Sequence, residues 1–401
     1  MRVAHISTQK NWGGGEKQVL YLLQNLHKWG LTQTLFCLKG SALAERSKNE
    51  AWETVEFAHP LLLPRERAIR ERATRERGVW GGEGTVAPPG DEPGHSNDLP
   101  PIDASTAGQK KGFDLIHTHD SKALTFALLA MSMSMSGKKK TPIINTCRMI
   151  KKPGWFSHIK FSHPAIRKHI CISHAVMESM RSFIKSPDKL TLIPSGIDLH
   201  HESSAPPPAH LRQSFGIPED AFLVISVGAL TRQKRPDFFL EIVQKLLVSG
   251  QNEKRPLHFL LVGEGPLRGT LERMVSERGL GKVCRLSGFT PHASALIQLA
   301  DLLVSTAVDE ALGNVIMEAF AAQTPVVASH SGGVGDLVEH GRTGFLASPK
   351  EVDEFAAYCC QIIENRKLAR AFCVNALEKI EKFDIVSVCK DVLALYSQCQ
   401  E

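Results

Sequence analysis

The sequence predicts an α/β protein of two domains, each built on a doubly wound parallel sheet. Short apolar strands alternate with amphipathic helices in both halves of the chain, which is typical of parallel sheets covered by helices on both faces. A proline-rich stretch at residues 203–208 separates the two series. The 401 residues are enough for two or three domains of roughly 150 residues, each with a buried core.

In the first half, a strand at residues 3–7 is followed by a helix at residues 16–28, whose apolar side chains recur along one face. The further strands expected here are residues 33–38, 115–118, 143–145 and 169–172. An insertion at about residues 65–112 interrupts this series. It joins an Arg-Glu-Arg repeat to sequence rich in Gly, Pro, Ser and Asp, with few apolar residues to bury.

The second half repeats the same order of elements. The expected strands are residues 222–227, 258–262, 283–286, 302–305 and 326–328, and the expected helices between them are residues 237–248, 267–277 and 315–321. From residue 351 the chain is expected to be helical to its end, apart from a break near residues 383–384. The boundary between the halves is placed after residue 190.

Composition excludes several classes of protein. The longest apolar runs fall far short of the roughly 20 residues that a membrane-spanning helix needs. Nine cysteines, an odd number without a Cys-x-x-Cys pair, imply neither a disulfide framework nor a zinc site. A strand signal that begins at the first residues leaves no room for a signal peptide, so we expect a cytoplasmic protein.

The net charge of +6 is unevenly distributed, at +11 for residues 1–190 and −5 for residues 191–401. Residues 137–177 contain nine Lys and Arg, no acidic residue, and three interleaved aromatic residues. This pattern favours an anionic membrane surface as partner, on the inner face of the cytoplasmic membrane, over a merely solvated positive face. No nucleic-acid-binding module is recognised, so nucleic acid is not an expected partner.

Two segments of the first half carry candidate binding residues. Residues 12–16 (WGGGE) place three glycines before a helix, where backbone N–H groups and the helix dipole attract an anion; the alternative is an ordinary turn. In residues 114–120 (DLIHTHD), His117 and His119 lie at the carboxyl end of a strand, where parallel sheets bind ligands. Such imidazoles can exchange protons or bind hydroxyls, or they can simply cap the strand; no third cluster supports a metal site.

Two further segments lie in the second half. Residues 228–236 (GALTRQKRP) bring Arg232, Lys234 and Arg235 to the end of a strand, where they can neutralise a diphosphate. In residues 309–318 (DEALGNVIME), Glu310 and Glu318 would lie roughly 12 Å apart if the intervening turn were helical. Acidic residues with apolar flanks need a partner, and that spacing suits the sugar and the ribose of a nucleotide sugar.

Together these segments resemble the GT-B retaining nucleotide-sugar glycosyltransferases of family 4, and within them the enzymes of lipopolysaccharide and capsular polysaccharide biosynthesis. Supporting segments are residues 192–198 (LIPSGID), 227–234, 260–266 (LLVGEGP) and 325–346. The resemblance covers nearly the whole chain outside the insertion. It implies two Rossmann-like domains that face a cleft, an acceptor-binding domain at 1–190 and a nucleotide-sugar-binding domain at 191–383. The C-terminal helix, within 384–401, is expected to cross back to the first domain.

The resemblance also implies roles for individual residues. The catalytic residues would be His119, Glu310 and Lys234. The donor would contact Gly14, Gly15, Arg232, Gly263, Glu264, Phe289, Leu312, Gly313, Asn314, Val315 and Glu318. Glu16, His117 and Arg148 would lie on the acceptor side. Many relatives carry arginine where this chain has Ala229, and Arg232 is expected to compensate.

The implied activity is transfer of a hexose from a nucleotide-diphosphate sugar to a lipid-linked or saccharide acceptor, with retention at the anomeric carbon. No cofactor and no metal ion are expected, because the chain lacks the Asp-x-Asp motif by which another class of glycosyltransferase holds Mg²⁺. Two alternatives share the architecture, a nucleotide-sugar epimerase and a non-catalytic lipid-binding relative. The sequence leaves the donor sugar, its base, the acceptor and the oligomeric state undefined.

Overall fold

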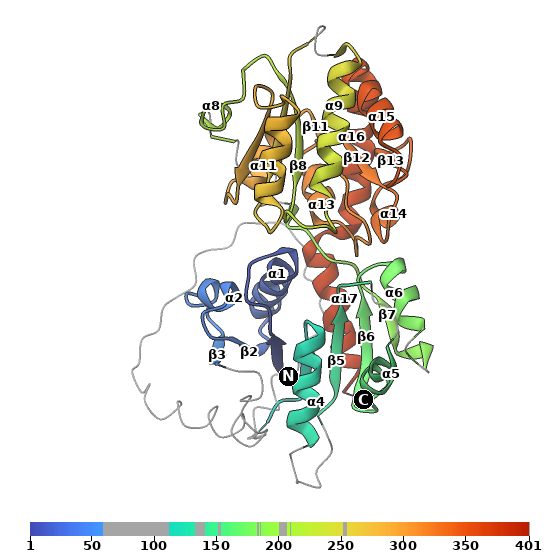
Figure 1. Ribbon diagram of the computed structural model, residues 1–401. Helices are drawn as coiled ribbons and strands as arrows, with labels where there is room; N and C mark the ends of the chain where they lie inside the picture. Colours follow the sequence, from blue (N-terminus) through green and yellow to red (C-terminus); the bar gives the residue numbers. More distant parts are fainter. Residues whose placement is uncertain are drawn as a thin grey trace, which may run out of the picture.

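The protein folds into two α/β domains (Figure 1), each with its own parallel sheet. The computed structural model describes residues 1–58, 112–132, 141–150, 154–182, 184, 186–199, 207–208, 210–251 and 255–400. The expected insertion at 65–112 lies outside the described residues as far as residue 111, and the basic stretch 137–177 is described only in part. The predicted fold class is confirmed.

The first domain contains a seven-stranded sheet in the order β3-β2-β1-β4-β5-β6-β7, and every neighbouring pair is parallel. Its strands are β1 (Arg2–Ser7), β2 (Thr32–Leu38), β3 (Glu53–Phe57), β4 (Leu115–Thr118), β5 (Ile143–Cys147), β6 (Ile166–Cys171) and β7 (Leu190–Leu192). Its helices are α1 (Gly14–Lys28), α2 (Ala42–Arg46), α4 (Ser121–Ser132), α5 (Trp155–Phe161) and α6 (His174–Arg181), with a 3₁₀ turn at Pro187–Lys189.

The second domain contains a six-stranded parallel sheet in the order β10-β9-β8-β11-β12-β13. Its strands are β8 (Phe222–Val227), β9 (Leu257–Val262), β10 (Cys284–Gly288), β11 (Leu302–Ser305), β12 (Val326–Ser329) and β13 (Phe345–Ala347). Its helices are α8 (Leu211–Ser214), α9 (Pro236–Val248), α11 (Arg268–Glu277), α12 (Ala293–Leu299), α13 (Asn314–Ala321), α14 (Val334–Leu337), α15 (Val352–Glu364) and α16 (Arg366–Ile380).

The last helix, α17 (Ile385–Gln398), packs against the first domain although the chain reaches it from the second (Figure 1). A 3₁₀ turn at Glu381–Phe383 breaks the helical run, and the side chain of Asp384 caps the new helix. The apolar face of α17 shares one core with β1, β4, β5, β6 and α1. That core contains Val3, Leu22, Leu26, Leu115, Ile144, Ile170, Val388, Val392, Leu395 and Tyr396.

The chain crosses between the domains twice, and the two crossings lie side by side. Ile197 donates to the carbonyl of Phe383, and Ile385 donates to the carbonyl of Ile197, each at 2.9 Å. The Gln18 amide in α1 pairs with the backbone of Gly196 in both directions, at 2.6 and 2.8 Å. The linker at this point is therefore a structured part of the domain junction.

Most strands follow the sequence prediction closely, since each expected strand overlaps an observed one. The strands β3, β7 and β13 were not expected, because they are short and carry little apolar periodicity. The first sheet ends with β7, at residue 192. Among the described residues, no helix combines the length and apolar character needed to cross a membrane.

Replacement of Gly196 by alanine should destabilise the junction of the two crossings. A Cβ atom there would lie 2.9 Å from the backbone Cα and 2.6 Å from the Cδ1 of Ile385, so the backbone must move. We expect thermal or chemical denaturation to show a loss of about 1–3 kcal/mol. Gly281→Ala is the matched control, because its Cβ would meet open space. Equal stability of the two variants would contradict this packing.

Candidate active site

The candidate site forms where the carboxyl ends of both sheets meet. In each sheet the strand order reverses beside the first strand, between β1 and β4 and between β8 and β11. Ligands of open parallel sheets bind outside the strand ends at such reversal points. The loops after these four strands carry most of the residues that the sequence singled out.

The N-termini of α1 and α13 meet across the domain junction. A Cβ atom on Gly14 would lie only 2.3 Å from Nδ2 of Asn314, so glycine is needed for this approach. Gly313, just before α13, adopts φ +109°, a conformation that side chains disfavour. Gly15 lies in the same first turn of α1. Two helix N-termini, each with unpaired N–H groups and a positive dipole end, therefore point to one place, as an anion-binding site requires.

Glu310 does not lie on the same helix as Glu318, so the condition on which their expected spacing depends is not met. The helix α13 begins only at Asn314, so Glu310 belongs to the loop that precedes it. This loop is held by backbone contact with Gly333, whose N–H donates to the carbonyl of Glu310 at 2.8 Å. The roughly 12 Å estimate from helical rise therefore does not apply.

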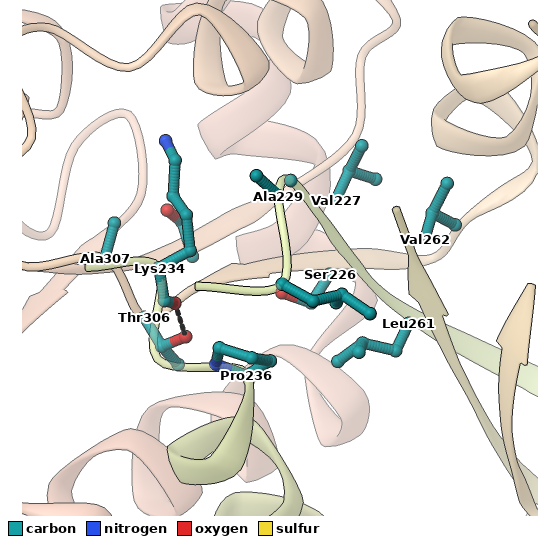
Figure 2. Close-up of a pocket in the computed structure, with 12 residues that line it drawn as sticks. Ser226, Val227, Ala229, Lys234, Pro236, Leu261, Val262, Thr306 and Ala307 are labelled. Carbon is teal, nitrogen blue, oxygen red and sulfur yellow. Dashed lines mark hydrogen bonds between the residues drawn. The ribbon is translucent and has the colours of Figure 1, made fainter. Parts of the chain in front are cut away.

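Lys234 and Glu310 form an ion pair with each other. Their side chains are 31% and 13% exposed, so the pair is partly shielded from solvent. Lys234 lines a pocket at the ends of β8, β9 and β11 (Figure 2), where its side chain rises beside Ala307. The hydroxyl of Thr306 donates to the carbonyl oxygens of Lys234 and Arg235, both at 2.9 Å, and fixes the loop that presents the lysine.

The three cations of this loop do not act together. Arg235 caps α9 in a left-handed conformation, donates to the carbonyl of Pro349 and stacks on Phe238. Arg232 is exposed to solvent. The sequence grouped these arginines with Lys234, but in the described residues only Lys234 reaches Glu310.

The remaining predicted donor residues lie on neighbouring loops of the second domain. Gly263 packs directly on the loop after β8, since a Cβ there would lie 1.9 Å from the carbonyl oxygen of Gly228. Glu264 pairs with Arg268 at 2.6 Å. Phe289 is 64% exposed, so its ring is open to solvent. Before and in α13, Leu312 is buried and Val315 is half-buried.

Glu318 is paired with a residue of the other domain. Nζ of Lys17 in α1 lies 2.9 Å from Oε1 of Glu318 in α13, and the two side chains are 23% and 17% exposed. The sequence prediction did not include Lys17. Its position after the glycine turn, one residue beyond Glu16, was the only signal that could have suggested it.

A buried histidine cluster supports the other side of the site. The rings of His117 and His119 lie 4.1 Å apart, and Nδ1 of His5 in β1 lies 3.0 Å from Nε2 of His119. Nδ1 of His117 hydrogen-bonds the hydroxyl of Tyr396 at 2.6 Å, and its Nε2 bonds the hydroxyl of Thr146 at 2.7 Å. Both ring nitrogens of His117 are thus engaged, so this residue supports His119 and does not present a nitrogen to an acceptor.

Each histidine of this cluster offers a nitrogen, and these three nitrogens lie within 4.8 Å of one another. A metal ion here would have to displace one of the two bonds that His117 makes, to Tyr396 or to Thr146, beside the cationic Arg148. We therefore interpret the cluster as a hydrogen-bonded network. Burial lowers the pKa of His5 to about 3, against the opposing bond to Gln33. Burial and then the neighbouring imidazoles hold the pKa of His119 well below its usual range.

Glu16 and Arg148 complete the side of the site that the first domain supplies. Arg148 follows β5, and its Cδ would lie 3.6 Å from a Cβ on Gly15. Burial lowers the pKa of Arg148 to about 10, while Glu16 and Asp120 oppose that shift. In the described part of the chain, its Nε and Nη1 have no hydrogen-bond partner. Burial also raises the pKa of Glu16, which Arg148 partly offsets.

Comparison with known families agrees with this geometry. Residues 12–201 match the family described as "Glycosyltransferase Family 4", and residues 209–379 match "Glycosyl transferases group 1". The chain belongs to these GT-B glycosyltransferases. The two matches divide the chain near the domain junction, so each family segment corresponds to one of the two sheets.

Curated relatives transfer different sugars. Alpha-D-kanosaminyltransferase of Streptomyces kanamyceticus is 31% identical over 170 residues, which is 42% of this chain and 43% of that protein. The 2-deoxystreptamine N-acetyl-D-glucosaminyltransferase of Niallia circulans is 25% identical over 313 residues, 72% of this chain and 77% of that protein. The match to the first of these thus spans less than half of its length.

Solved structures share the fold. Anabaena Alr3699/HepE in complex with UDP-glucose superposes with a TM-score of 0.77 at 20% identity, over 99% of this chain and 100% of that chain. A glycosyltransferase from Rickettsia africae ESF-5 gives a TM-score of 0.78 at 15% identity, over 100% and 98%.

The sequence analysis missed three residues that the structure brings to the site, namely His5, Lys17 and Tyr396. His5 lies opposite His117 in the register of β1 and β4. If the pairing of β1 with β4 had been known, the register of these strands would have predicted that the two histidines lie close together. Tyr396 comes from α17, 279 residues away along the chain, and no local pattern points to it.

Stability should fall as the pH drops below about 6.5. An unfolded histidine takes up a proton near that pH, whereas folded His5 resists protonation to about pH 3, so the unfolded chain binds more protons. We expect up to about 1.4 kcal/mol per pH unit from each such histidine. Urea denaturation between pH 7.5 and 5 measures this slope. His5→Gln should reduce the dependence of the unfolding free energy on pH, whereas replacement of the exposed His292 by glutamine should leave it unchanged. An unchanged pH dependence in His5→Gln would contradict the role given to buried His5.

Proposed function

We propose that this protein is a retaining hexosyltransferase that uses a nucleotide-diphosphate sugar. The observation that carries the proposal is the placement of two glutamates, each paired with a lysine, at the meeting point of two helix N-termini. Carboxylates accept hydrogen bonds from sugar hydroxyls, while lysine and helix N-termini bind phosphate. The solved neighbour HepE was crystallised with UDP and with UDP-glucose, which makes a uridine donor the first to test.

In this proposal Lys234 and the N–H groups of Gly14, Gly313 and Asn314 hold the diphosphate. Negative charge grows on this group as the bond to the anomeric carbon breaks, so fixed positive groups stabilise the transition state more than the ground state. Glu310 accepts hydrogen bonds from the sugar, and Glu318 accepts them from the ribose. The exposed ring of Phe289, with Gly263 and Glu264, lies beside the base.

The acceptor hydroxyl attacks the anomeric carbon on the face from which the diphosphate leaves. The carbon–oxygen bond to the diphosphate breaks, the bond to the acceptor oxygen forms, and the acceptor proton passes to the departing phosphate. Configuration is thereby retained, and no metal ion or cofactor takes part. His119, kept neutral by burial, contacts the reacting sugar, and Glu16 and Arg148 lie on the acceptor side.

The proposed acceptor is a glycolipid or polysaccharide of cell-surface glycan synthesis, reached at the cytoplasmic face of the membrane. Support comes from exposed apolar side chains of the first domain, Leu129, Met149 and Ile159, which lie in or beside the basic stretch. Lys160 donates to the hydroxyl of Ser121 at 2.6 Å, so α5 and α4 are neighbours. Apolar residues within a positive surface are typical of a peripheral membrane contact.

The two glutamates should fail in different ways. Glu310→Gln should cut kcat at least about 100-fold with little loss of UDP affinity, because Glu310 contacts the sugar part of the donor and its neutralisation leaves Lys234 available to the diphosphate. Glu318→Gln should weaken UDP binding by about tenfold. Release of UDP from UDP-sugars and isothermal titration with UDP measure the two effects. Lys245→Met, at an exposed ion pair with Asp353, is the control. Wild-type activity in both glutamate variants would contradict the proposal.

The membrane contact should depend on charge and on the exposed apolar residues of the first domain. Sedimentation with vesicles that contain phosphatidylglycerol should show binding that weakens as salt rises, with less binding to neutral vesicles. Ile159→Ser should reduce binding. Val248→Ser is the control, since Val248 is exposed on the second domain. Binding that is absent, or that salt and Ile159→Ser leave unchanged, would contradict the contact.

A further inference from the structure

We propose that Lys17 is a positioning residue for the donor, which orients Glu318 and couples ribose binding to closure of the two domains. The inference rests on the proposed function, which assigns Glu318 to the ribose hydroxyls. Lys17 belongs to α1 of the first domain and Glu318 to α13 of the second. A residue of the acceptor-binding domain therefore acts on the donor through a partner in the other domain.

The contact between these residues is well formed. Nζ of Lys17 lies 2.9 Å from Oε1 of Glu318, and neither side chain is more than a quarter exposed. The ammonium also lies 5.6 Å from the centre of the Tyr21 ring, one turn further along α1. Because the ring and the carboxylate both attract the ammonium, the side chain has a defined position rather than that of a loose surface lysine.

An ionised carboxylate has about four acceptor positions, more than one lysine occupies. A bond from Lys17 to Oε1 takes one of these positions and fixes the plane of the group. The ammonium also offsets the repulsion between Glu318 and an incoming diphosphate, because its positive charge lies next to the carboxylate. Lys17 thus holds the carboxylate of Glu318 in position without itself contacting the ribose.

The other lysine–glutamate pair of the site behaves differently. Lys234 and Glu310 both belong to the second domain, so their contact does not depend on how the domains are placed. The Lys17–Glu318 pair exists only when α1 and α13 approach, as they do where Gly14 meets Asn314. Ribose binding and domain closure therefore favour one another through this pair.

The affinities of Lys17 variants and of a control variant for two ligands test the inference. For Lys17→Met, isothermal titration should show about fivefold weaker binding of UDP, the size expected for a half-buried ion pair. It should show less than about twofold weaker binding of 2′,3′-dideoxyuridine diphosphate, which lacks the hydroxyls that Glu318 would bind. Lys17→Arg should restore UDP affinity. Lys48→Met, which removes an ion pair with Glu45 far from the site, is the control.

Equal losses for the two ligands would overturn the action through the ribose, because Lys17 would then act on the diphosphate, on closure alone or on the fold. No loss for either ligand would overturn it as well. Wild-type protein that binds no nucleoside diphosphate would instead overturn the proposed function, and the inference with it. Small-angle scattering tests the coupling: unliganded Lys17→Met should have a larger radius of gyration than wild type and Lys48→Met. Equal radii would overturn the coupling to closure.

Discussion

The approach of α1 to α13 is the constraint on which the rest of the site depends. Gly14 can meet Asn314 only because it has no side chain, and the same contact brings Lys17 within reach of Glu318. The two helices face each other with their positive ends, an arrangement that is electrostatically unfavourable without negative charge between them. The carboxylates at this place offset part of that cost, and a bound diphosphate would offset more.

The first domain's share of the site relies on a helix that arrives from the second. Tyr396 in α17 holds His117, and His117 packs against His119, so the orientation of the predicted cleft histidine depends on the end of the chain. The three imidazoles are kept neutral by burial, which suits groups that exchange hydrogen bonds with hydroxyls. A protein that lost α17 would lose an apolar core together with one of the two hydrogen-bond partners of His117.

Sequence reasoning predicted most of the fold because the strands are apolar and the helices amphipathic, and both patterns follow from burial. It singled out Lys234 and His119 because they follow strands, and Glu310 and Glu318 because apolar residues flank them, while their roles came from the family resemblance. It could not predict His5, Lys17 and Tyr396 as partners, since each contact joins elements far apart along the chain. It estimated the separation of Glu310 and Glu318 only for a helical turn between them, and the left-handed Gly313 before α13 keeps Glu310 outside the helix.

The side-by-side crossings near Ile197 and Asp384 limit the ways in which the two halves can move. Two backbone segments that are joined by hydrogen bonds can bend together as one hinge. They resist twisting of one domain against the other and sliding of one domain past the other. A single connecting segment would allow the two domains to adopt many relative orientations. The conformational entropy that is lost when the two domains close is therefore small, because the domains can move little except by changing one angle between them.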